Sequence, residues 1–212
     1  MYYFPENYNL NTFREAKENS YVRLFNASPN VPSVDVYIGD TLIIRNLLYK
    51  QYTNYIPLQP GNYKFKIYAS NDSITPIIAT DVFLPEYSVL NLSIVGVYPQ
   101  VSLYPIPEPA FPQNFGRSCI RFINLSPNSP PINVSMSNGT SVFTDVAYTY
   151  ITDYACIPGG TYSFSFTSAG TNNLLVTLSN AQLQPNNFYS IYLVGLNEGT
   201  PPLEALLIPE PR

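Results

Sequence analysis

Apolar and polar residues alternate along many short segments of this chain. In residues 63–68, for example, Tyr63, Phe65 and Ile67 are interleaved with Lys64 and Lys66. A period of two residues places one face of a β-strand on a core and the other face in solvent. Further strands are predicted in the first half of the chain at residues 21–26, 34–38, 41–46, 52–57, 77–84, 89–97 and 101–104.

Turn-forming dipeptides separate these strands. Gly39-Asp40 follows one predicted strand, and Asn138-Gly139 is the strongest short hairpin signal in the chain. Strands that recur at intervals of roughly 8–12 residues are typical of a β-sandwich. The predicted fold class is therefore all-β, with immunoglobulin-like (transthyretin-like) antiparallel sandwiches and little helix.

The chain contains an internal duplication. Residues 23–30 read RLFNASPN and residues 121–128 read RFINLSPN, an offset of 121 − 23 = 98 positions. A period this long is that of a whole domain and not of a solenoid repeat. We expect an N-terminal arm at 1–20, a first sandwich at 21–104, a Pro-rich linker at 105–118 and a second sandwich at 119–212.

The arm and the linker carry signals of their own. Thr12 and Glu15 have the spacing of a capping box, which allows one or two helical turns over residues 13–18. The alternatives are a loosely docked arm or one that docks on a neighbouring subunit. Alternating prolines predict an extended, stiff linker. Its Ile-Pro-Glu-Pro at 106–109 returns at 208–211, so it belongs to the repeat unit.

Charge excludes several kinds of partner. Only 11% of the residues are charged and the net charge is −4, so the chain lacks the basic surface of a nucleic-acid-binding protein. No apolar run has the length that a membrane span requires. The first residues lack a basic cluster followed by an apolar run, so we expect synthesis in the cytoplasm without a signal peptide.

The chain has no histidine, and this argues against catalysis. Histidine is the commonest general base and zinc ligand, and its absence rules out a Ser-His-Asp or Cys-His arrangement. The carboxylates form no recognisable catalytic pair, and neither a phosphate loop nor a calcium loop is present. We expect no catalytic, cofactor-binding or metal-binding residues and no enzymatic activity.

The residues singled out instead have structural roles. Asp35 follows the first Ser-Pro-Asn turn, where its carboxylate could accept hydrogen bonds from backbone N–H groups of that loop, and Asn133 keeps an acceptor oxygen at the matching place. Arg23 and Arg121 are expected to pair with a nearby carbonyl or carboxylate. The predicted turn-bracing residues are Ser28, Pro29, Asn30, Asp35, Ser126, Pro127, Asn128 and Asn133.

Two cysteines lie in the second half, Cys119 and Cys156, where the first half has Tyr21 and Pro57. They permit an intradomain disulfide, a cross-link between chains or two buried thiols.

The block at residues 23–37, the Asn54-Tyr55 pair and residues 60–63 resemble the bacterial family called domain of unknown function 4397, and both halves of the chain share the likeness. The resemblance implies small sandwiches found on extracellular and cell-surface proteins. Tandem pairs without an export signal are similar to proteins associated with the spore surface in spore-forming Firmicutes. The family supplies no enzymatic activity.

These observations favour a non-catalytic structural protein that self-assembles into a surface layer, coat or fibre on the spore surface, with itself as the expected partner and other surface proteins as further ones. The alternative is an adhesion or carbohydrate-binding module in which exposed tyrosines such as Tyr49, Tyr52 and Tyr150 stack on sugars.

Overall fold

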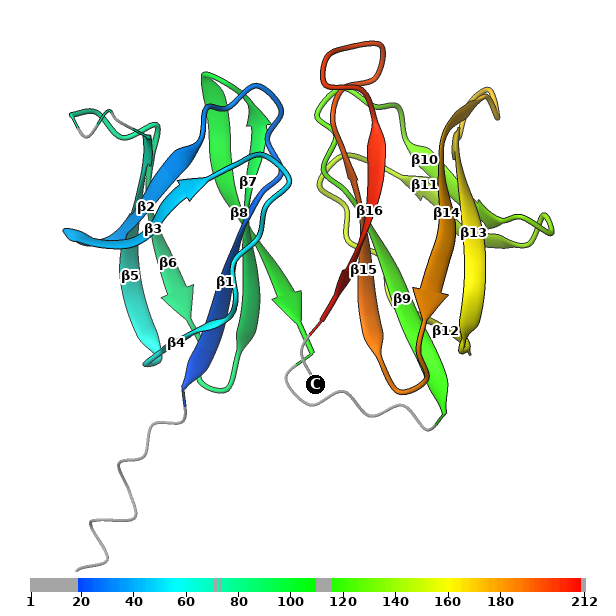
Figure 1. The fold of residues 1–212 in the computed structure, drawn as a ribbon, viewed down its shortest axis with the longest axis horizontal. Coiled ribbons are helices and arrows are strands. Elements are labelled where there is room, and N and C mark those ends of the chain that lie inside the picture. The colour runs from blue at the N-terminus through cyan, green and yellow to red at the C-terminus, as the bar shows by residue number, and fades with distance from the viewer. Residues whose placement is uncertain (1–18, 71, 73, 110–115, 211–212) are drawn as a thin grey trace, which may run out of the picture.

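The computed structural model describes residues 19–70, 72, 74–109 and 116–210. The arm at 1–18, with its possible helical turn, lies outside the described residues. Over the rest the all-β prediction is confirmed: two β-sandwiches stand side by side, each made of two four-stranded sheets (Figure 1).

The first sandwich contains eight strands. They are β1 (Ser20–Asn26), β2 (Val34–Ile38), β3 (Thr41–Leu47), β4 (Ile56–Leu58), β5 (Gly61–Ala69), β6 (Ile78–Leu84), β7 (Val89–Val97) and β8 (Gln100–Glu108). The inner sheet has the order β4-β1-β7-β8 and the outer sheet the order β3-β2-β5-β6.

The second sandwich repeats this plan. Its strands are β9 (Arg117–Asn124), β10 (Ile132–Met136), β11 (Ser141–Val146), β12 (Ala155–Pro158), β13 (Gly160–Ser168), β14 (Leu174–Leu183), β15 (Phe188–Val194) and β16 (Glu204–Pro209). The inner sheet is β12-β9-β15-β16 and the outer sheet is β11-β10-β13-β14. The sheets are mostly antiparallel, but β1 and β7 run parallel, as do β9 and β15.

The alternation of β5 has the predicted consequence. Phe65 and Ile67 are fully buried in the first core, while Lys64 on the opposite face is exposed. The inner strands behave differently. In β7, Leu90, Leu92 and Ile94 pack into the sandwich, yet the residues between them are buried as well. A strand buried on both faces has lost its alternation because a second layer covers it.

That second layer is the other domain. The two inner sheets face each other in the middle of the molecule, and the outer sheets form its flanks (Figure 1). A third apolar cluster lies between the domains and takes residues from both: Phe25, Ala27, Val95, Ile106, Ile123, Leu125, Tyr192, Val194 and Ile208. The rings of Phe25 and Tyr192 meet at 5.1 Å between centroids.

The Pro-rich segment at 105–118 differs from the expected linker. Strand β8 continues to Glu108 and β9 begins at Arg117, so both ends of the segment are strand. Proline cannot donate a backbone hydrogen bond and is tolerated at a sheet edge. Because β8 is an edge strand of its sheet, Pro105 and Pro107 can pair with Leu92 and Leu90 of β7.

Candidate functional site

Two places in the molecule gather polar side chains. One is the buried interface between the inner sheets, and the other is a hollow on the outer sheet of the first domain.

The buried interface holds two arginine–glutamate pairs. Arg23 lies on β1 and its Nη2 is 2.5 Å from Oε1 of Glu108, at the end of β8. Arg121 lies on β9 and its Nη2 is 2.7 Å from Oε1 of Glu210, which follows β16. Both carboxylates are fully buried, with side-chain exposures of 0%. The glutamates come from the two copies of Ile-Pro-Glu-Pro.

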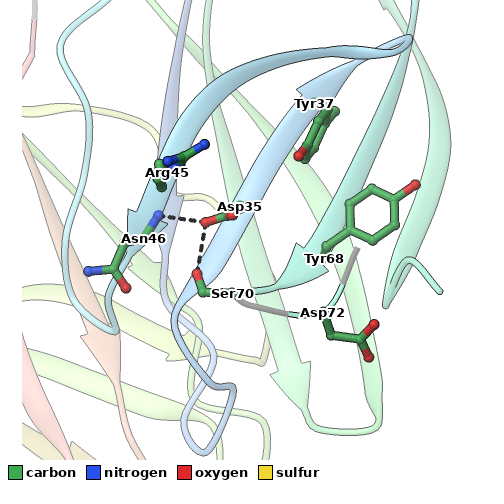
Figure 2. A pocket seen from close by; sticks show the side chains of 7 residues that line it. All are labelled: Asp35, Tyr37, Arg45, Asn46, Tyr68, Ser70 and Asp72. Atoms are coloured by element: carbon green, nitrogen blue, oxygen red, sulfur yellow. Dashed lines mark hydrogen bonds between the residues drawn. The ribbon is translucent and has the colours of Figure 1, made fainter. Parts of the chain in front are cut away.

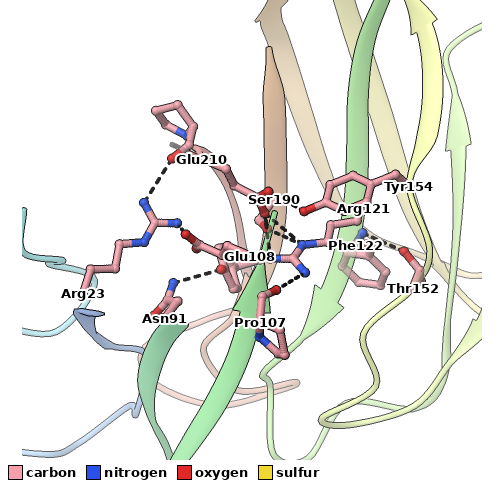
Figure 3. Close-up of polar contacts among 12 residues, drawn as sticks. Arg23, Asn91, Pro107, Glu108, Arg121, Phe122, Thr152, Tyr154, Ser190 and Glu210 are labelled. Carbon is pink, nitrogen blue, oxygen red and sulfur yellow. Dashed lines mark hydrogen bonds and ion pairs between the residues drawn. The ribbon is translucent and has the colours of Figure 1, made fainter. Parts of the chain in front are cut away.

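Each arginine also reaches across to the other domain. Arg23 Nη1 donates to the carbonyl of Pro209 at 3.0 Å, and Arg121 Nη1 donates to the carbonyl of Pro107 at 2.7 Å. Figure 3 shows the two guanidinium groups and their glutamates close together between the domains. The contacts are reciprocal, as expected where two copies of one surface meet.

Tyrosines complete the network. Tyr55 donates its hydroxyl to Glu108 and Tyr154 donates its own to Glu210. Their rings also lie 5.1 Å from the guanidinium carbons of Arg23 and Arg121. At the centre, Asn91 Nδ2 donates to the hydroxyl of Tyr192 at 2.9 Å. Each glutamate carboxylate accepts hydrogen bonds from a guanidinium and from a phenol. These bonds satisfy most of the carboxylate lone pairs that lose their contact with water on burial.

Burial shapes the acid–base properties of this network. It raises the pKa of Tyr192 to about 12, with Glu108 adding to the effect. Burial also raises the pKa of Tyr55 and of Tyr154. It works against the charge of Arg23, but Glu108 and the neighbouring tyrosines outweigh it and raise the pKa of that guanidinium. The arginines therefore stay charged and the tyrosines neutral at physiological pH. Burial also raises the pKa of Glu108, against the opposing effect of Arg23.

Sequence reasoning predicted a partner for the arginines but missed which one. Glu108, Glu210, Tyr55 and Tyr154 were not among the predicted site residues. A signal did exist, because both the Ile-Pro-Glu-Pro motif and the Tyr of residues 54–55 recur in the second half. What could not be read was that these repeats converge on one place between the domains.

The predicted turn-bracing residues are placed in two groups. Ser28 Oγ donates to the carbonyl of Gly96 at 2.7 Å and Ser126 Oγ to that of Gly195 at 2.8 Å, so each Ser-Pro-Asn turn is tied to the end of β7 or β15. Pro29 and Pro127 stand inside these turns. Asn30 has a positive φ of 66°, and Asn128 exchanges two hydrogen bonds with the backbone of Asn197.

Asp35 braces a different segment from the one expected. Its Oδ1 accepts from the backbone N–H of Asn46 and from Ser70 Oγ, both at 2.8 Å, and neither donor belongs to the Ser-Pro-Asn turn. Asn46 has a positive φ of 57° at an irregularity in the β2–β3 pairing. Asn133 does the same in the second domain, where its Oδ1 accepts from the N–H of Asp145 at 2.9 Å. Both side chains thus hold a bulge in the neighbouring strand.

The cysteines form a disulfide. Cys119 on β9 lies directly opposite Cys156 on β12, with their Cα atoms 4.0 Å apart. The bridge joins the edge strand of the second inner sheet to its neighbour. The same positions in the first domain pair Tyr21 with Pro57 and have no such link.

Of the three tyrosines expected to stack on sugars, two are exposed. Tyr52 is 46% exposed and Tyr150 is 60% exposed. The prediction for Tyr49 was wrong, because this side chain packs against the apolar cluster between the domains and its hydroxyl is buried. Burial raises its pKa to about 12.

The hollow lies on the solvent face of the first outer sheet. It measures about 410 Å³ and is lined by Asp35, Tyr37, Arg45, Asn46, Tyr68, Ser70 and Asp72. Asp35 and Tyr37 project from one face of β2, and Tyr68 stands opposite Asp35 on β5. Figure 2 shows Asp35 between the two tyrosine rings on one side and Arg45 with Asn46 on the other. The tyrosine rings contact each other edge to face, 5.3 Å between centroids.

No group of three or more histidine, cysteine or acidic residues within the described ranges could hold a metal ion. Over the same residues, no helix is long and apolar enough to cross a bilayer.

Solved structures with a similar arrangement of strands are distant. The TIE protein of Bacillus anthracis shares 9% identity with a TM-score of 0.25, covering 84% of this chain, which spans about a third (34%) of that protein. A family 26 carbohydrate-binding module of Eubacterium rectale Amy13K, solved with maltoheptaose, shares 10% identity with a TM-score of 0.28, covering 92% of this chain and 98% of the module.

A streptococcal virulence factor described as binding α-glucan shares 12% identity with a TM-score of 0.25, and the match covers 84% of this chain and 92% of that one. TM-scores this low carry no argument about function. No curated protein matches the chain in sequence. The family model described as "Domain of unknown function (DUF4397)" matches residues 20–135 and 130–212, which together span both sandwiches. The chain therefore belongs to the DUF4397 family, with two copies in tandem.

Proposed function

We propose that this protein is a non-catalytic structural unit that assembles with copies of itself into a surface layer, coat or fibre, with the spore surface as its place. The observation that carries the proposal is the arrangement of the sheets. The inner sheets form the interface between the two domains, and the outer sheets, with their edge strands, lie on the flanks of the molecule (Figure 1).

The interface supports a rigid unit. It combines an apolar cluster drawn from both domains with two reciprocal arginine contacts and the Asn91–Tyr192 hydrogen bond. At the rim, Lys50 Nζ lies 2.7 Å from a Glu204 carboxylate oxygen of the other domain. Relative domain motion is the usual expectation unless an interface is large and apolar. A block of fixed shape is what a regular lattice or fibre requires.

The edge strand β14 supports the mode of assembly. A sheet edge presents unpaired N–H and C=O groups, and proteins commonly protect it with lysine or proline. Strand β14 has ten residues, LLVTLSNAQL, with neither lysine nor proline nor any other charge. Its Leu174 is 63% exposed. On the opposite flank, β6 is also an edge strand and carries Phe83, which is 62% exposed. Pairing between such edges of successive copies would extend the assembly at both ends.

The edge itself can be tested with charge. The double variant Thr177→Lys/Ser179→Lys places two lysines at exposed positions of β14. The matched control, Ser163→Lys/Ser165→Lys, adds the same two charges to β13, the neighbouring central strand of the same outer sheet, where the first domain already has Lys64 and Lys66. Negative-stain microscopy and light scattering at high protein concentration should find ordered multimers for wild type and control, and loss of these for the β14 variant.

The outcomes separate three ideas. A wild-type protein that stays monomeric at every concentration would overturn the proposal. Multimers that survive lysines on β14 but not on β13 would mean that copies pack face to face and not edge to edge.

A further inference from the structure

The hollow on the first outer sheet continues into a second one. The larger measures about 410 Å³ and the smaller about 120 Å³, and Tyr37 and Tyr68 line both. Gly39 and Asp40 of the β2–β3 hairpin also line the smaller hollow, and Lys66 Nζ lies 2.8 Å from Asp40 Oδ1. Together they form a groove along the outer face of β2 with the two tyrosines at its middle. Its main volume falls within the roughly 300–1,000 Å³ of small-ligand sites.

The polar groups in the groove are fixed in position and can form further hydrogen bonds with a ligand. Asp35 uses Oδ1 for Asn46 and Ser70, which fixes the carboxylate, while Oδ2 accepts no hydrogen bond from the described residues. Arg45 forms no ion pair with any residue in the described ranges. A carboxylate is an acceptor and a guanidinium is a donor, so the groove offers both to a ligand that carries both.

The charge of the groove discriminates between ligands. Asp35 and Asp72 carry one negative charge each and Arg45 one positive charge, so the larger hollow has a net charge of about −1. An anionic ligand such as a phosphate ester would face two carboxylates. A purely apolar ligand would bury polar groups without partners, which is costly. A neutral ligand with several hydroxyl groups on a compact ring can use all the groups of the groove: its hydroxyls hydrogen-bond to the donor and the acceptors, and its C–H face packs on the aromatic rings.

We propose that this groove is a binding site for a neutral saccharide chain. The rings of Tyr37 and Tyr68 contact the C–H faces of a sugar unit, while Asp35 and Arg45 hydrogen-bond to its hydroxyls. The site is separate from the edge strands β6 and β14 and from the interface between the domains, so binding does not depend on self-assembly through those edges.

The second domain provides an internal comparison. In the matching strand pairing, Asn133 stands opposite Thr167 as Asp35 stands opposite Tyr68, and Ser135 replaces Tyr37. These replacements remove both rings and the carboxylate of Asp35, while the second domain has a carboxylate of its own, Asp145, at the place of Asn46. Because the second sandwich has the same strands with these residues, the same substitutions in the first domain should leave its fold intact.

The experiment uses the full chain and a panel of neutral oligosaccharides. An array of gluco-, xylo-, manno- and N-acetylglucosamine oligomers identifies a probe, and calorimetry measures its affinity. The variant Tyr37→Ser/Tyr68→Thr copies the second domain, and Tyr150→Ser removes a more exposed ring elsewhere. We expect the groove variant to weaken binding at least about tenfold, which corresponds to about 1.4 kcal/mol, and Tyr150→Ser to bind as wild type.

Each result decides the matter. No binding of any oligosaccharide at millimolar concentration overturns the proposal, as does binding that the groove variant leaves unchanged. Binding lost in Tyr150→Ser and kept in the groove variant would place the sugar site on the exposed tyrosines instead. Circular dichroism confirms that each variant is folded.

Discussion

The two halves of the chain are more alike on the inner faces of their sandwiches than on the outer faces. On the inner faces, Arg23 and Glu108 have Arg121 and Glu210 as counterparts, and each arginine pairs with the glutamate of its own domain and with a proline carbonyl of the other. The two pairs differ only in detail, since Arg121 Nε also donates to Ser190, where the first domain has Asn91. On the outer faces, the tyrosines of the first groove have become small polar residues in the second domain.

The difference follows from what each face touches. An inner strand packs one face against its own sandwich and the other face against the other domain, so every position along it has packed neighbours that a change would disturb. An outer position needs only to keep the strand alternation and remain compatible with water. Tandem copies of one domain can therefore keep a common interface while one outer face acquires a ligand groove.

The most direct way to break the inner face is Arg23→Met. It leaves Glu108 buried without its cation, and removal of one partner from a buried pair typically costs about 3–5 kcal/mol of unfolding free energy. Urea denaturation measures the loss. Lys64→Met, at an exposed position of β5, is the control and should change stability by less than about 0.5 kcal/mol.

A second variant tests whether the charge is the reason. Arg23→Met/Glu108→Leu removes both charges and should recover about half of the loss or more, since a buried pair can often be replaced by apolar residues. A double variant as unstable as the single one would mean that the arginine acts by packing and hydrogen bonding to Pro209 alone. Arg121→Met should match Arg23→Met if the two halves of the interface are equivalent.

The disulfide is the main covalent difference between the halves. Cys119 and Cys156 are separated by 37 positions, and a link across such a loop stabilises a protein by about 2–4 kcal/mol. The double variant Cys119→Ala/Cys156→Ala should lose that amount in thermal unfolding. Reductant should lower the melting temperature of wild type and leave that of the variant unchanged. Equal effects on both would show that the reductant acts elsewhere.

Alkaline pH probes the centre of the interface. The unfolded Tyr192 loses its proton near its ordinary pKa of 10, whereas the folded one keeps it until about pH 12. The raised pKa contributes stability that is present below pH 10 and is lost as pH rises to about 12, a difference of about 2–3 kcal/mol. Tyr192→Phe has no such proton, so its stability should fall less steeply over this range.

Two controls accompany the pH series. Tyr150→Phe removes a hydroxyl from an exposed ring and should follow the wild-type curve in urea unfolding from pH 9 to pH 12. Parallel curves for Tyr192→Phe and wild type would contradict a neutral tyrosine in the folded interface. At neutral pH, Tyr192→Phe also deprives Asn91 of its hydrogen-bond acceptor, which should cost about 1–2 kcal/mol.

Much of this architecture could be predicted because its signals are local. The alternation at Phe65 and Ile67, the hairpin dipeptides and the recurrence of RLFNASPN as RFINLSPN each lie within a few residues. Strand β8 could not be bounded in this way, because its prolines suggested a linker. They are tolerated only because β8 lies at a sheet edge, and that is a property of the tertiary fold.

The sites were harder to predict for a related reason. Glu108 and Glu210 meet Arg23 and Arg121 across many residues of sequence, and the hollow joins side chains of three strands. Such positions are brought together by register and by the packing of domains. Tyr49 illustrates this: it resembles any other loop tyrosine in sequence, yet it packs against the apolar cluster between the domains.

Asp35 is the position where the two outer faces can be compared with the smallest change. Asp35→Asn installs the residue that Asn133 provides in the second domain, and an amide oxygen can accept from the Asn46 N–H as a carboxylate does. We expect Asp35→Asn to cost less than about 1 kcal/mol and Asp35→Ala about 1–2 kcal/mol, because alanine leaves the N–H of the bulge without an acceptor. Hydrogen exchange at the amide of Asn46 locates the effect, and faster exchange is expected only in the alanine variant. Equal protection in both variants would mean that strand pairing alone holds the bulge, and that Asp35 is kept for its charge in the groove.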